Sequence, residues 1–153
     1  MDQKKTRLEI VDMIIELGLK ARKQKKEQEA LQYFEQAIKA YPPNVPAYVE
    51  AGKSLKALQK LSEAKQRFKQ TLQKKADHLE VLMELGNIAY LEKEWEKALE
   101  KFQAAVKYHS NHPNAYVQAG KSLKNLEHRF SNREQSSIER EREVWGVWEV
   151  LKN

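Results

Sequence analysis

Two Gly-Lys-Ser triplets are the first segments of this sequence that could do chemistry. Gly52-Lys53-Ser54 and Gly120-Lys121-Ser122 resemble the end of a loop that holds nucleotide phosphates. Such a loop also needs a glycine five residues before the Gly-Lys pair and a strand in front of it. Ala47 and Ala115 stand at those positions, inside segments with helical periodicity. We therefore expect helix interiors here and no nucleotide site.

A pair of histidines three residues apart could hold a metal ion if it lay on a helix. His109 and His112 have this spacing, but they precede Pro113 in a segment that predicts a polar turn. The chain has no cysteine, which excludes thiol ligands and disulfides. Its many glutamates alternate with lysine, arginine or apolar residues and predict solvated helix faces rather than an acid–base pair. We expect no metal, no cofactor and no enzymatic activity.

The composition is typical of a soluble helical protein. Of the 153 residues, 41% are hydrophobic and 33% are charged, and Lys, Glu, Gln, Ala and Leu are abundant. These residues lose little side-chain freedom in a helix. No stretch approaches the roughly 18 apolar residues of a membrane span, and the first 26 residues predict an amphipathic helix rather than a signal peptide. We expect a cytoplasmic protein with a single domain.

A period of 34 residues organises the elements that carry these side chains. Segment 47–58 matches segment 115–126 at ten of twelve positions, and their offset is twice the period. Four columns of small or aromatic residues recur in the same register. They are Gly18, Gly52, Gly86 and Gly120; Ala30, Ala64 and Ala98; Phe34, Phe68 and Phe102; and Ala37, Thr71 and Ala105. Such repetition is typical of proteins that stack one supersecondary unit several times.

Each period predicts two helices that pack as a hairpin. Apolar residues recur at helical spacing in two stretches per unit, and a polar break such as Lys23–Glu27 separates them. The pair Pro42-Pro43 ends the first unit, because a helix interior does not tolerate it. The glycine column predicts close helix–helix contacts at all four of its positions. The predicted units are 11–44, 45–78, 79–112 and a partial unit, 113–130.

This pattern resembles the tetratricopeptide repeat family. The family motif runs from a large apolar residue through Leu-Gly, a Tyr-like position, Ala, Phe and Ala to Pro. The first unit supplies Ile14, Leu17, Gly18, Ala21, Ala30, Phe34, Ala37 and Pro42. The resemblance implies an all-α solenoid of about three and a half helical hairpins with a C-terminal helix. It also implies a scaffold for protein–protein interaction, whose concave groove is lined by the first helix of each hairpin.

The resemblance places the groove residues at fixed positions around each glycine. They are Ile15, Leu19 and Arg22 in the first unit, Val49, Lys53 and Lys56 in the second, Met83, Asn87 and Tyr90 in the third, and Val117, Lys121 and Lys124 in the fourth. Lysines at two levels predict a partner peptide or protein segment with acidic groups. Asn87 offers an amide that can bond its backbone. The alternative is that these lysines only increase solubility.

The same register disfavours one known class of ligand. Family members that clamp the C-terminal carboxylate of heat-shock chaperones use Lys, Asn, Asn, Lys and Arg. At those positions this chain has Ile15, Leu19, Glu50, Glu80 and Glu84. Binding of chaperone tails is therefore not expected.

The C-terminal part departs from the family pattern. Asn132 and Ser136 stand where Ala and Phe belong, and Ser131-Asn-Arg-Glu134 predicts a capping box that starts a separate helix. That helix, within 131–153, is expected to cover the last hairpin, because terminal repeats are usually atypical. The alternative is a partner or homodimer surface that includes Trp145 and Trp148.

Two other functions stay open. The chain could be a non-catalytic repeat segment of a larger enzyme, for example a glycosyltransferase, in which the repeats select substrate proteins. Residues 45–78 hold eight Lys and Arg against three Asp and Glu and could attract nucleic acid weakly. No base-reading residue recurs from unit to unit, so we expect a protein partner, no specific nucleic acid and no membrane association.

Overall fold

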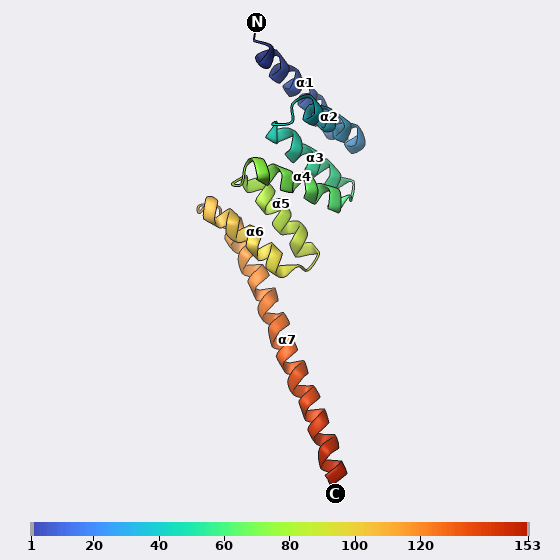
Figure 1. Cartoon of the computed structure of the whole chain (residues 1–153), viewed down its shortest axis with the longest axis vertical. Helices are drawn as coiled ribbons and strands as arrows, with labels where there is room; N and C mark the ends of the chain where they lie inside the picture. The colour runs from blue at the N-terminus through green and yellow to red at the C-terminus, as the bar shows by residue number, and fades with distance from the viewer. Residues whose placement is uncertain (1, 153) are drawn as a thin grey trace.

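The computed structural model describes the backbone of residues 2–152 and the side chains of residues 2–144. Over this range the chain forms helices and no strand, which confirms the all-α prediction. The elements are α1 (Gln3–Lys23), α2 (Glu27–Ala40), α3 (Val45–Ala57), α4 (Leu61–Lys74), α5 (Leu79–Leu91), α6 (Trp95–Tyr108) and α7 (Pro113–Lys152). The hairpins α1–α2, α3–α4 and α5–α6 stack in sequence order, and α7 packs on α6 (Figure 1).

The turn inside each hairpin recurs with the period of the sequence. Lys25, Gln59 and Lys93 are 34 residues apart, and each has a positive φ of about 60°. The next residue donates its N–H to a carbonyl five residues back, as in Lys26 to Ala21 at 3.0 Å. This pattern ends a helix by satisfying its free carbonyls. Because a left-handed residue other than glycine costs roughly 1–2 kcal/mol, packing of the second helix must stabilise the turn.

The small and aromatic columns form the core that stabilises the hairpins. Phe34, Phe68 and Phe102 are fully buried, as are the alanine column and the column of Ala37, Thr71 and Ala105. A Cβ built on Gly18, Gly52 or Gly86 would lie 2.5 Å from the ring of the phenylalanine sixteen residues later. The predicted close contact is therefore confirmed at these three glycines, where only hydrogen fits.

The fourth glycine is an exception to that prediction. A Cβ on Gly120 would meet no atom within 4 Å. The hairpin turn is also missing in the fourth unit, because Glu127, which corresponds to Lys93, lies inside the continuous helix α7. The prediction of a close helix–helix contact at Gly120 is wrong, because no second helix of the described chain covers this glycine.

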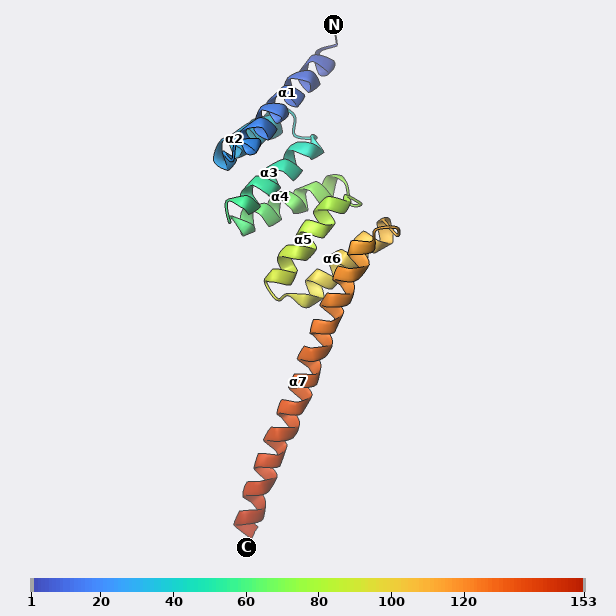
Figure 2. The same ribbon diagram turned by 180° about the vertical axis from the view of Figure 1, so that it is seen from behind.

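Helix α7 also corrects the predicted capping box at Ser131–Glu134. The helix runs without interruption from Pro113 to Lys152, so no helix begins at Ser131. Asn132 and Ser136 replace the buried Ala and Phe that stabilise the turn in the other units. A turn back into a second helix would therefore bury no apolar side chains at these two positions. Beyond α6 the helix extends away from the hairpins (Figures 1 and 2). All described side chains from Ser131 to Val144 are exposed and do not cover the last hairpin.

Two of the expectations concern contacts of the chain with a second copy of itself and with a membrane. The predicted homodimer surface through Trp145 and Trp148 lies outside the described side chains. In the described part of the chain, no helix has both the length and the apolar content to cross a membrane.

Candidate functional site: the groove face

The groove face is the set of side chains predicted to line the concave side, and it is carried by α1, α3, α5 and the first turns of α7. Arg22 at the end of α1 reaches across to α3. Its guanidinium forms an ion pair with the Glu50 carboxylate and donates to the Glu50 carbonyl at 2.7 Å and to Ser54 Oγ at 2.8 Å. Ser54 is fully buried. Arg22 is thus held in place between the first two units rather than free for a ligand.

The next pair of units repeats this contact. Lys56 Nζ donates to Glu84 Oε2 at 2.5 Å, and the two residues lie 34 positions after Arg22 and Glu50. Lys53 bridges the same boundary, with Nζ 3.2 Å from Glu50 Oε1 and 2.8 Å from Glu80 Oε1. The side chains predicted to attract an acidic partner at this level are therefore already paired with carboxylates of the protein.

The electrostatic environment of Lys53 reflects this pairing. Its partial burial acts to lower the pKa of the ammonium group, because burial disfavours a charge. The hydrogen bonds and charges of Glu80 and Glu50 act in the opposite direction and prevail, so the pKa is raised above 10.5. Lys53 consequently stays charged at every physiological pH and serves as a bridge between α3 and α5.

The third level of the groove face is built differently. Tyr90 occupies the position of Arg22 and Lys56, and its hydroxyl accepts a hydrogen bond from Asn125 Nδ2 at 2.9 Å. The Tyr90 ring meets the Trp95 ring edge-on with centroids 4.9 Å apart. Neutral aromatic and amide groups thus replace the ion pairs at the junction with α7.

The predicted groove residues differ in how much surface they offer. Val49 and Met83 are buried. Asn87 is half-buried, and Val117, Lys121 and Lys124 are exposed on α7. Within the described part of the chain no ion pair involves Lys121 or Lys124. Available cationic groups therefore gather at the α7 end of the groove face.

Glu50, Glu80 and Glu84 lie at the predicted clamp positions, and their pairing with the neighbouring lysines and Arg22 was not predicted from the sequence. One signal was present. A cation and a glutamate recur 28 residues apart, as Arg22 with Glu50 and as Lys56 with Glu84. The offset of 28 residues is six less than the period of 34 residues that separates equivalent positions on successive first helices.

The other chemical candidates have structural roles. Gly52-Lys53-Ser54 lies in the middle of α3, with Lys53 and Ser54 bonded as described above. His109 Nε2 lies 2.5 Å from the Asp77 carbonyl oxygen, and the Ala115 N–H donates to His112 Nδ1 at 3.3 Å. The histidines thus bond backbone groups in the polar turn that was predicted. No cluster of three or more acidic or histidine side chains that could hold a metal exists among the described residues.

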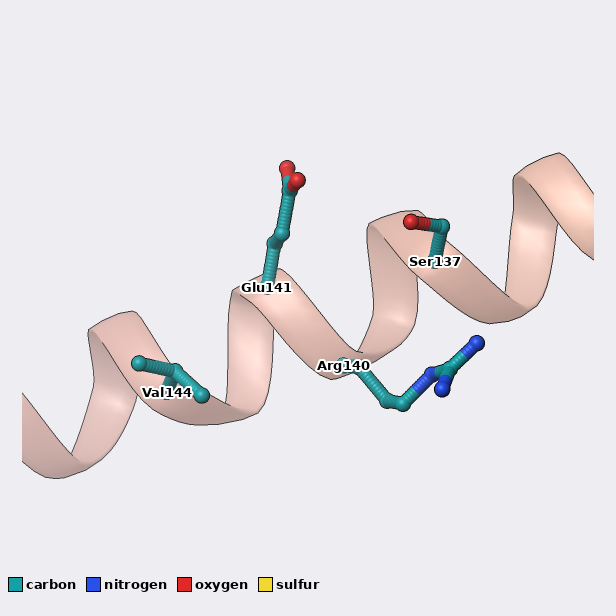
Figure 3. A pocket seen from close by; sticks show the side chains of 4 residues that line it. All are labelled: Ser137, Arg140, Glu141 and Val144. Carbon is teal, nitrogen blue, oxygen red and sulfur yellow. The ribbon is translucent and has the colours of Figure 1, made fainter.

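A shallow hollow lies further along α7, lined by Ser137, Arg140, Glu141 and Val144. Figure 3 shows that all four side chains project from one helix, with no second element facing them. Because a single exposed helix encloses no space, this hollow is not a candidate for a small-molecule site.

Comparisons with known proteins agree with this architecture. Tetratricopeptide repeat models match residues 17–44 and 49–116, which together make up more than half of the chain. No curated protein matches it. The solved structures that are similar to it include the first TPR domain of Spaghetti (RPAP3), bound to the HSP90 peptide SRMEEVD. The two chains are 18% identical with a TM-score of 0.70, and the match covers 76% of this chain and 92% of that domain.

Two further solved structures give the same result. The Arabidopsis OM64 TPR domain has 19% identity and a TM-score of 0.70, and the match covers 77% of this chain and 98% of that domain. MamA has 20% identity and a TM-score of 0.69, with 76% and 63% covered. At these identities the likeness shows the fold alone. The matched models and the recurring glycine–phenylalanine contacts together show that the chain belongs to the tetratricopeptide repeat family.

Proposed function

We propose that this chain is a protein-interaction scaffold that binds a segment of a partner protein at the α7 end of its groove face. The observation that carries the proposal is the pair of exposed lysines, Lys121 and Lys124, beside exposed Val117. The other cations of the groove face, Arg22, Lys53 and Lys56, already form ion pairs with glutamates of the protein. A partner carrying Asp, Glu or a C-terminal carboxylate complements this end of the groove.

Neighbouring side chains supply the remaining recognition chemistry. Asn87 has an amide that can donate to and accept from an extended peptide backbone. Tyr90 presents an aromatic surface next to a polar tip, a combination that is enriched at protein interfaces. Neither residue is part of an ion pair in the described chain, so contact with a ligand breaks no charge pair. The proposal gives the chain a binding role rather than a catalytic one.

Reversing the charge of Lys121 and Lys124 tests the proposal. A peptide is first selected on the wild-type chain from a phage library of random peptides with free C-termini. We expect Lys121→Glu with Lys124→Glu to weaken its binding at least tenfold, or about 1.4 kcal/mol, mainly through slower association. Surface plasmon resonance at two salt concentrations measures both the rate and its salt dependence.

The matched control reverses two exposed lysines on second helices, Lys69→Glu in α4 and Lys107→Glu in α6. It changes the net charge equally but leaves the groove face intact, so the affinity should change less than twofold. Equal weakening by both double variants would show that only the overall charge matters and would refute the proposed site.

A chaperone-type tail should bind poorly to this chain. The first TPR domain of Spaghetti has been solved with the peptide SRMEEVD, whereas Glu50, Glu80 and Glu84 stand at the clamp positions here. We expect that peptide to bind at least about 100-fold more weakly to this chain than to the Spaghetti domain, because glutamate side chains cannot donate hydrogen bonds to its C-terminal carboxylate and the nearby cations already pair with them. Fluorescence anisotropy with labelled SRMEEVD on both proteins measures the ratio, and comparable affinities would contradict the expectation.

A further inference from the structure

The start of α7 repeats a surface that is covered elsewhere in the same molecule. Segment 115–126 is identical to segment 47–58 of α3 except at Gln118 and Asn125. In α3 this surface is packed against α4, so Tyr48 is 7% and Leu55 is 3% exposed. The equivalent residues of α7, Tyr116 and Leu123, are 50% and 48% exposed. The same side chains are thus buried in one unit and bare in the other.

The glycine between them shows what is missing. In α3, the ring of Phe68 fills the space next to Gly52 and comes within 2.5 Å of where a Cβ would be. Gly120 occupies the same place in α7, and nothing lies within 4 Å of that point. Tyr116, Gly120 and Leu123 share one side of α7 because they are four and then three residues apart. We call them the uncovered face.

The described chain does not supply a cover for this face. In the register of the repeats, Asn132, Ser136 and Glu139 stand at the positions of Ala64, Phe68 and Thr71. None of them supplies the aromatic ring of Phe68, and all three lie exposed on the straight continuation of α7. A polar segment of this kind cannot bury Tyr116 and Leu123.

We propose that the uncovered face docks an amphipathic helix of a partner protein, antiparallel to α7. The partner helix carries a phenylalanine over Gly120, with a small residue four positions before it and another three positions after it. This chemistry is taken from the helix that already covers the identical surface, since Ala64, Phe68 and Thr71 of α4 are fully buried. Continuity with the stacking of the solenoid fixes the orientation.

Two charge features favour the same arrangement. In the covered unit, Lys74 Nζ lies 4.9 Å from the centroid of the Tyr48 ring. A cation at the C-terminal end of the partner helix would meet Tyr116 in the same way. Its N-terminal end would lie near Glu127, which complements the positive end of a helix dipole. Exposed Phe130 continues the apolar side one turn beyond Glu127.

This surface is separate from the groove face. Lys121 directly follows Gly120, and Lys124 directly follows Leu123. Because successive residues of a helix are about 100° apart around its axis, the two lysines point to a different side of α7 from the uncovered face. The groove ligand and the partner helix could therefore be bound at the same time. The chain would then connect two protein segments through one helix.

A peptide with the sequence of residues 61–74 is the probe for this proposal. Labelled with fluorescein and titrated with the full chain, it should bind saturably in an anisotropy measurement. Gly120→Leu should weaken binding at least tenfold, because the new side chain occupies the space of the phenylalanine ring. The variant itself should fold normally, since nothing lies near that position. The same peptide with Phe68→Ala should also bind at least tenfold more weakly.

A second measurement covers the case in which the short peptide is not helical enough to bind. Residues 127–142 are replaced by a copy of residues 59–74, which gives α7 the turn and the second helix of the second unit. We expect the melting temperature to rise by roughly 5 °C or more, and Gly120→Leu to cancel this rise.

Three outcomes would overturn the proposal. Peptide binding that is unaffected by Gly120→Leu would place the peptide elsewhere. Absence of binding together with an unstabilised graft would show that the face does not accept a helix. Sedimentation that shows a wild-type dimer, dissociated by Gly120→Leu, would identify a second copy of the chain as the occupant instead of a partner helix.

Discussion

Gly86→Leu is expected to lower the free energy of unfolding by about 3 kcal/mol and the melting temperature by roughly 6–12 °C. A Cβ on Gly86 would already lie 2.5 Å from the ring of Phe102, which is fully buried. Leucine adds three more carbon atoms beyond that clash. The two helices of the third hairpin must separate or Phe102 must leave the core. Circular dichroism during heating measures the effect.

The matched control for this variant is Gly120→Leu. Both glycines occupy the same position of the repeat, and both lie within helices. At Gly120 no atom lies close enough to clash, and leucine is a better helix former than glycine by roughly 0.5–1 kcal/mol. The melting temperature of Gly120→Leu should stay the same or rise slightly. If Gly86→Leu melts at the wild-type temperature, the packing described for the hairpins is wrong.

Arg22→Met is expected to cost about 2 kcal/mol of stability. Methionine retains the aliphatic stem but removes the ion pair with Glu50 and the hydrogen bond to the buried hydroxyl of Ser54. Breaking a fully buried pair costs roughly 3–5 kcal/mol, and the value is reduced here because both side chains keep some contact with solvent. Urea denaturation of wild type and variant measures the difference.

A comparison and a double-mutant cycle separate the contributions of Arg22. Lys56→Met removes a single hydrogen bond to Glu84 from a more exposed side chain, so it should cost less than about 1 kcal/mol. Combining Arg22→Met with Glu50→Gln should cost less than the sum of the single changes, because the two groups interact directly. Additive costs would mean that the charge of the Glu50 carboxylate contributes nothing, and that Arg22 stabilises the fold through its other contacts, which are the Ser54 hydroxyl, the Glu50 carbonyl and the Phe34 ring.

The repeating interior of the first three units could be predicted from the sequence. Gly18 meets Phe34 only sixteen residues later, and the same spacing recurs at Gly52 and Gly86. A contact this local depends on the hairpin alone, and three copies of it make chance agreement improbable. The alternation of helices and turns and the buried columns could be predicted for the same reason, because they too depend on contacts within one hairpin.

The state of the groove lysines could not be predicted in this way. Whether Lys53 and Lys56 are free depends on how far one hairpin is shifted along the next, because that shift brings Glu80 and Glu84 of α5 within reach. The shift results from side-chain packing between units, which composition and periodicity do not specify. Lys121 and Lys124 remain available for a ligand because no further hairpin follows α7 in the described chain to supply the glutamates that Lys53 and Lys56 find on α5.

The sequence by itself determined the family and the register of the first three hairpins, since these follow from a period of local contacts. Only the tertiary structure decided the fate of the fourth unit. Its capping-box signal at Ser131 is a weak local preference, and a reversal of the chain at Glu127 requires a left-handed residue that packing must offset. Without an alanine and phenylalanine column after Gly120 that packing is absent. The helix therefore continues, and it leaves Tyr116 and Leu123 uncovered.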